Sequence, residues 1–64
     1  MKREQFIQHL RKLARQKNVR FEVMTIEGKG SHYRIVFGGK STILKSGELN
    51  PGYIRLVKKQ LEIE

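Results

Sequence analysis

The sequence predicts an α+β domain of order α-β-β-β-α, in which two helices pack on one face of a three-stranded antiparallel sheet. Three observations predict this fold. Apolar residues recur at helical spacing over the first 18 positions, β-branched and aromatic runs separated by glycines fill 20–45, and Asn50-Pro51 opens a second amphipathic segment. Residues 1–64 are expected to form a single domain with one thin core and a shallow site, because so short a chain cannot also enclose a deep cleft.

The first helix is expected from Lys2 to about Asn18. Its apolar stripe consists of Phe6, Ile7, Leu10, Leu13 and Ala14. Off the stripe lie the cations Arg3, Arg11, Lys12 and Arg15. The simplest interpretation of these charges is a solvated helix face, and the alternative is a row of cations that guides phosphates, with Arg11 and Arg15 as its candidate residues. His9 belongs to the same face, where we expect a surface histidine.

Three strands are expected between the helices. The first, Arg20–Glu27, carries apolar residues on both faces, so its pattern leaves its orientation open. A loop at 28–30 leads into the second strand, His32–Phe37, and the third strand is Ser41–Lys45. Between them, Gly38 and Gly39 are expected to supply the two positive-φ residues of a tight hairpin turn.

The second helix follows a loop at 46–49. Asn50 is a favourable N-cap, and Pro51 is a favourable first helical residue, because its missing N–H would have no partner there. The expected apolar face consists of Tyr53, Ile54, Val57 and Leu61. The polar face carries Arg55, Lys58 and Lys59.

The composition favours a polyanionic or acidic partner. Fourteen Lys and Arg residues against six acidic residues give a net charge of +8 and a pI of about 10.3. Cysteine is absent, which excludes a disulfide framework. The only imidazoles, His9 and His32, have no carboxylates near them at ligand spacing, so we expect no metal and no cofactor. Charged residues interrupt the N-terminal segment every few positions, so it resembles neither a signal peptide nor a membrane span. We therefore expect a cytoplasmic protein.

The segment 28–37 carries the strongest functional signal. His32 and Arg34 lie two apart on the second strand, so they share a face roughly 7 Å apart, opposite to the aromatic set that enters the core. A histidine titrates near neutral pH and can remove the proton of an RNA 2′-hydroxyl, whereas Lys29 and Arg34 can stabilise the phosphate charge. Gly30 and Ser31 are further candidates for phosphate contact, and the backbone amides of 28–31 are expected to form an anion-binding concavity.

The element order is that of the double-stranded-RNA-binding domain, and its details resemble the HicA toxin family of bacterial toxin–antitoxin pairs. The resemblance covers nearly the whole chain and rests on Gly30-Ser31-His32, on the strand that ends at Phe37, and on the segment 48–52 before a Leu-, Val- and Lys-rich helix. It implies a metal-independent mRNA interferase, a type II toxin, with His32 as the catalytic histidine. Many relatives carry further histidines where this chain has Tyr33 and Lys45.

The resemblance also implies a partner, a HicB-type antitoxin that covers the site of an otherwise monomeric toxin. With one histidine in the segment, either His32 acts as both base and acid, or water and Lys29 protonate the leaving oxygen. Two other classes of function remain open at this point. One is a non-catalytic RNA-binding module that recognises A-form shape through its basic helix faces. The other is an adaptor whose basic surface binds an acidic protein.

Overall fold

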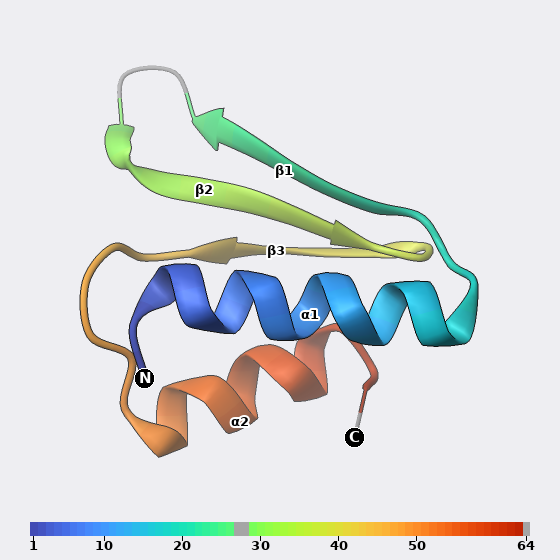
Figure 1. Ribbon diagram of the computed structural model, residues 1–64. Helices are drawn as coiled ribbons and strands as arrows, with labels where there is room; N and C mark the ends of the chain where they lie inside the picture. Colours follow the sequence, from blue (N-terminus) through green and yellow to red (C-terminus); the bar gives the residue numbers. More distant parts are fainter. Residues whose placement is uncertain (27–28, 64) are drawn as a thin grey trace.

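The chain folds in the predicted element order. The computed structural model describes the backbone of residues 1–26 and 29–63 and the side chains of residues 1–26 and 32–63. Its elements are helix α1 (Arg3–Lys17), strands β1 (Phe21–Ile26), β2 (Lys29–Phe37) and β3 (Lys40–Leu44), and helix α2 (Pro51–Gln60). The strands form one antiparallel sheet in the order β1-β2-β3, and both helices lie on the same side of it (Figure 1). The predicted α+β fold is confirmed.

Local hydrogen bonds fix the ends of both helices. At the start of α1 the Lys2 N–H donates to Gln5 Oε1 at 3.1 Å, and the helix ends at Asn18, whose left-handed backbone (φ 57°, ψ 47°) lets its N–H bond back to Arg15 O. At the start of α2 the Asn50 side chain accepts a hydrogen bond from the Tyr53 N–H at 2.8 Å, as predicted for an N-cap.

Strand pairing decides the orientation of β1. Phe21, Val23 and Thr25 lie opposite Phe37, Ile35 and Tyr33 of β2. Ile35 and Phe37 are buried, and Phe21 and Val23 pack against the core, so this face of the sheet meets the helices. The Phe21 and Phe37 rings contact edge to face, with centroids 6.5 Å apart. The other face of the sheet is left uncovered by either helix (Figure 1).

The structure corrects two sequence-based expectations about turns. Strand β2 begins at Lys29, which pairs with Ile26, so residues 29 and 30 are strand rather than loop. Gly28, the first residue of the predicted loop, and Glu27, the last of the predicted first strand, lie outside the described residues. In the two-residue turn between β2 and β3, Gly38 alone has a positive φ (62°), which is the pattern of a type II′ turn and not of the two-glycine type I′ turn expected.

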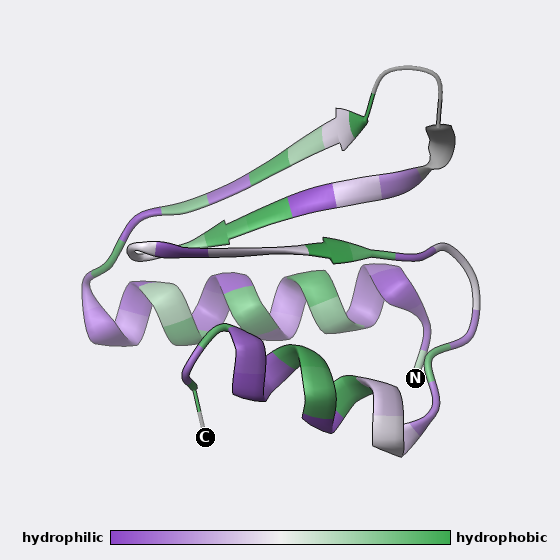
Figure 2. Cartoon of the chain, turned by 180° about the vertical axis from the view of Figure 1, so that it is seen from behind, coloured by the Kyte–Doolittle hydropathy of each residue, from purple (hydrophilic) through white to green (hydrophobic). Residues whose placement is uncertain are grey.

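One core unites the helices with the sheet. Its buried residues are Phe6, Ile7, Leu10, Ala14, Ile35, Phe37, Leu44, Leu49, Val57 and Leu61. Figure 2 shows hydrophobic and hydrophilic segments alternating along both helices, as expected for helices with one buried face.

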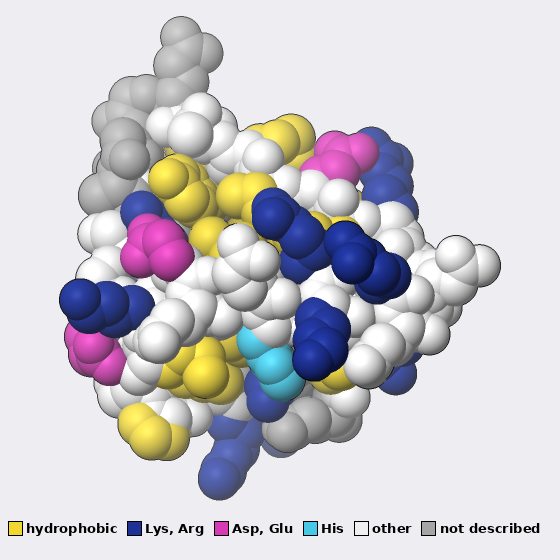
Figure 3. Space-filling view, viewed as in Figure 1, with side chains coloured by type: hydrophobic (Ala, Val, Ile, Leu, Met, Phe, Trp, Pro, Cys, Tyr) yellow, Lys and Arg dark blue, Asp and Glu magenta, His cyan; other side chains and the backbone are white. Residues whose placement is uncertain are grey.

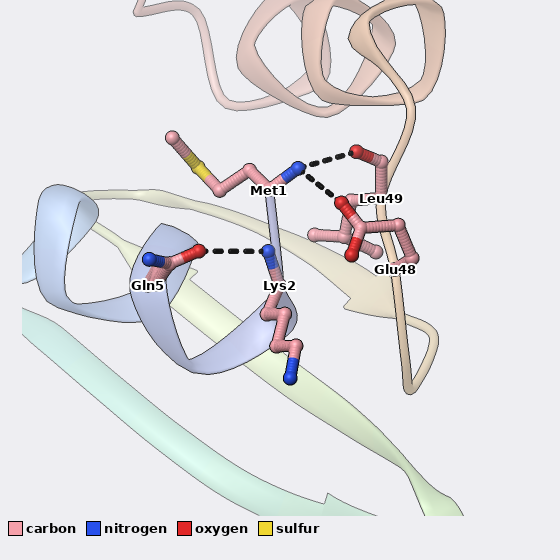
Figure 4. A network of polar contacts seen from close by, with 5 residues as sticks. All are labelled: Met1, Lys2, Gln5, Glu48 and Leu49. Carbon is pink, nitrogen blue, oxygen red and sulfur yellow. Dashed lines mark hydrogen bonds and ion pairs between the residues drawn. The ribbon is translucent and has the colours of Figure 1, made fainter.

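The start of the chain is tied to the segment that precedes α2 (Figure 4). The Met1 ammonium lies 2.5 Å from Glu48 Oε2 and 3.3 Å from the Leu49 carbonyl oxygen, and the Leu49 N–H donates to Met1 O. The hydrogen bond from this ammonium group lowers the pKa of the exposed Glu48 carboxyl below its ordinary value. These contacts hold α1 and the α2 entry at the same end of the molecule.

Candidate nucleic-acid interface

The uncovered face of the sheet carries one predicted site residue, Arg34. Alternation along the paired part of β2 places Tyr33, Ile35 and Phe37 toward the helices and Arg34 and Val36 on the opposite face. Arg34 is exposed and His32 is half-buried. The regular register does not include His32, so its position on the face of Arg34 stays a prediction from strand alternation.

His32 lies where the regular pairing of β2 ends. Tyr33 is the last residue that pairs in regular register with both neighbours, Thr25 on β1 and Leu44 on β3. Beyond it the β1 register shifts, because Ile26 pairs with Lys29. Such irregularities re-aim side chains and are common beside functional sites. His32 thus occupies the irregular end of the strand.

The side chains of Lys29 and Ser31, and the surroundings of Gly30, lie outside the described part of the molecule. Their backbone belongs to β2. These residues belong to the irregular end of β2, and Gly28 is outside the described residues, so the anion-binding concavity expected at 28–31 stays a prediction. The described residues that remain for phosphate contact are His32 and Arg34.

Arg34 stands between two apolar side chains on the same face. Its cross-strand partners are Met24 on β1 and Ile43 on β3, each 41% exposed. Side chains directly opposite each other in an antiparallel sheet lie about 4.5–5.5 Å apart at Cβ. The guanidinium is therefore flanked by aliphatic surface, which weakens competition from water for a bound anion.

The α1 cations form a second basic surface. Arg11, Lys12 and Arg15 are exposed and line a shallow hollow of about 320 Å³ together with Gln8. The Arg11 guanidinium carbon lies 5.7 Å from the Phe21 ring centroid. Figure 3 shows Lys and Arg side chains gathered over α1. Because α1 covers the helix side of the sheet, this surface is separate from the face that holds Arg34.

The sequence pattern predicts the wrong environment for Arg3. It was expected among the solvated cations of α1, but only 12% of its side chain is exposed, and its guanidinium carbon lies 4.0 Å from the Tyr33 ring centroid. Helical spacing does not reveal this cation–π contact, because Tyr33 reaches Arg3 only through tertiary packing. Arg3 therefore acts as a structural contact between α1 and β2.

His9 is exposed, as predicted, and it lines a hollow with Lys12, Leu13 and Gln16. Within the described side chains, no three His, Asp or Glu residues group as metal ligands would. Over the same part of the chain, neither helix has both the length and the apolar character that crossing a membrane requires. Comparisons with family models, with curated proteins and with solved structures find no match to this chain.

Proposed function

We propose that this chain is a metal-independent endoribonuclease, the toxin component of a type II toxin–antitoxin pair, with His32 as its catalytic residue. The observation that carries the proposal is that Arg34 is exposed on the face of the sheet that no helix covers, with the half-buried His32 two residues before it on the same strand. The net charge of +8 supports a polyanionic substrate. The resemblance of the sequence to the HicA family supports the reaction class.

The proposed reaction uses the nucleophile that RNA itself carries. His32 accepts the proton of a 2′-hydroxyl, whose oxygen attacks the adjacent phosphorus and forms a 2′,3′-cyclic phosphate. The P–O5′ bond breaks, and the leaving 5′-oxygen takes a proton from the imidazolium or from water. Arg34, two residues along the same strand, offsets the charge that develops on the phosphate oxygens.

A mechanism with one histidine fits the surroundings of Tyr33 and Lys45, the two positions at which many members of the HicA family carry further histidines. Tyr33 is on the helix side of the sheet, beneath Arg3, and the Lys45 ammonium lies 4.7 Å from the Tyr53 ring centroid. Tyr33 therefore does not share the face of Arg34, and Lys45 contacts a ring of α2. His32 then serves as base and acid in turn, which implies slow turnover that still suffices for a toxin.

The proposed partner is an acidic HicB-type antitoxin that covers the uncovered face of the sheet. An exposed Arg34 on a domain of charge +8 favours rapid association with an acidic surface. We place the pair in the cytoplasm, where mRNA is available, and we expect the free toxin to be a monomer.

The two histidines of the chain provide a matched test. Purified wild-type, His32→Ala and His9→Ala proteins are incubated with an unstructured RNA in EDTA, and with the same RNA carrying 2′-deoxy sugars. We expect the wild type and His9→Ala to cut only the all-ribose RNA and to leave cyclic phosphate ends, and His32→Ala to be inactive with an unchanged circular dichroism spectrum. Full activity of folded His32→Ala, or cleavage of the deoxy substrate, would exclude this mechanism.

The second basic surface favours one alternative, a non-catalytic RNA-binding module. Arg11, Lys12 and Arg15 project from α1, away from Arg34, as expected if the helix follows a phosphate backbone. In that case Arg11→Glu and Arg15→Glu should abolish RNA binding, His32→Ala should leave it unchanged, and no new RNA ends should appear with any variant.

A further inference from the structure

Helix α2 carries a second row of side chains beside its core-facing stripe. Ile54, Val57 and Leu61 face the core. Tyr53, Leu56 and Gln60, spaced i, i+3 and i+7, occupy the neighbouring face, and all three line a groove against strand β3. Tyr53 also packs against the core, but the core does not account for Leu56, which is 52% exposed, the highest value among the exposed large hydrophobic residues of the described chain.

Polar contacts at both ends of the row hold α2 alongside β3. The Tyr53 hydroxyl accepts a hydrogen bond from the Lys45 N–H at 3.1 Å and donates one to the Ile43 carbonyl at 3.2 Å. At the other end, the Thr42 hydroxyl donates to Gln60 Oε1. Leu56 lies between these two contacts along the helix.

The groove is apolar between its two polar ends. It has a volume of about 480 Å³, which falls within the range of about 300–1,000 Å³ common for ligand clefts. Leu56 on the helix and Ile43 on the strand, 52% and 41% exposed, present aliphatic surface to it. The remaining lining residues are Ser41, Thr42, Tyr53, Val57 and Gln60.

Cations flank this apolar strip on both sides. On α2, the exposed Lys59 is one turn from Leu56. On the sheet, Arg34 is the cross-strand partner of Ile43, and Lys45 follows one residue after the strand. None of the residues that line the groove is acidic.

We propose that the groove between β3 and α2 is a docking surface for an acidic, amphipathic protein segment that inserts an apolar side chain between Leu56 and Ile43. Carboxylates on either side of that side chain would pair with Lys59 on the helix and with Arg34 on the sheet. The inference concerns recognition of a protein and does not depend on RNA cleavage.

Three other occupants fit less well. A partner strand cannot extend the sheet at 43–45, because Tyr53 already uses the outward Ile43 carbonyl and Lys45 N–H. A second copy would bring the same cations face to face. Nucleic-acid bases would lack a free aromatic surface, since the Lys45 ammonium covers the Tyr53 ring.

The test uses a fluorescent peptide in which leucines recur at i, i+3 and i+4 among glutamates, and the same peptide with each leucine replaced by serine. Anisotropy gives the affinity, and ¹⁵N chemical shifts locate the site. We expect the leucine peptide to shift Ile43, Leu56 and Gln60, Leu56→Ser to weaken binding about tenfold, and the equally drastic Val19→Ser at another exposed hydrophobic position to leave it unchanged.

Equal binding of the serine peptide would overturn the proposal, because charge alone would then explain the affinity. So would equal losses in Leu56→Ser and Val19→Ser, or shifts confined to other surfaces. Displacement of the peptide by oligouridine together with matching shifts at Leu56 would reassign the groove to nucleic acid. Circular dichroism of each variant controls for folding. Apart from the oligouridine competition, the peptide measurements contain no RNA, so failure of the cleavage proposal would leave their outcome unchanged.

Discussion

Replacing Tyr53 with phenylalanine isolates the contact that closes the outer edge of β3. The change keeps the ring, and with it the packing against the core and the Lys45 ammonium. It removes the hydroxyl that accepts from the Lys45 N–H and donates to the Ile43 carbonyl. We expect a modest loss of stability and a freed strand edge.

The magnitude follows from the two hydrogen bonds. Each contributes about 0.5–1.5 kcal/mol net in a typical protein. Here both are long, at 3.1 and 3.2 Å, and water can hydrate the released groups because Ile43 and Lys45 are exposed. Values at the low end for both bonds give a loss of about 1 kcal/mol in the free energy of unfolding, or a melting temperature lower by about 4–8 °C for a domain of this size.

Urea and thermal unfolding followed by circular dichroism measure this loss, and Tyr33→Phe is the matched control. The Tyr33 ring lies under the Arg3 guanidinium, a contact that phenylalanine retains. We expect Tyr33→Phe to change the free energy of unfolding by less than about 0.5 kcal/mol. Amide exchange at Lys45 should be faster in Tyr53→Phe alone. Equal stability of the two variants, or unchanged exchange at Lys45, would refute the reasoning.

Three further outcomes are expected. The ammonium group at the start of the chain lowers the folded-state pKa of the Glu48 carboxyl. The stability from this contact is therefore present above the unfolded pKa near 4.5 and is lost as pH falls through the lower folded pKa. N-terminal acetylation should remove this part of the acid dependence of stability, as measured by urea titrations at a series of pH values. Gly38→Ala should lower the free energy of unfolding by about 1–2 kcal/mol, because φ at this position is 62°. Gly39→Ala should leave it nearly unchanged, because Gly39 has no left-handed φ and open space where a Cβ would be. Equal losses in thermal unfolding would contradict the type II′ turn. RNA affinity should fall as salt concentration rises, with a log–log slope of about −3 if roughly four phosphates of a single strand are neutralised. Arg34→Glu should reduce RNA cleavage more than RNA binding, whereas Arg11→Glu should reduce binding more than cleavage.

The sequence by itself determined the local elements of this protein. Each helix has its apolar residues at a spacing that only a helix places on one side, and Asn50 supplies the side-chain oxygen that starts α2. The paired glycines at 38 and 39 located the hairpin, and period-2 alternation predicts that His32 and Arg34 share a face. These features depend on residues a few positions apart, so the chain carries them without reference to its fold.

Only the tertiary structure decided features that join distant residues. The orientation of β1 came from its register with β2, since both faces of that strand carry apolar side chains. Arg3 is only 12% exposed because its guanidinium packs on Tyr33, 30 positions later. The groove exists because α2 returns to lie along β3, where Tyr53 bonds Ile43 and Lys45 and leaves Leu56 exposed. Strand pairing and helix docking are long-range contacts, and the periodicity of one segment contains no information about which other segment it will meet.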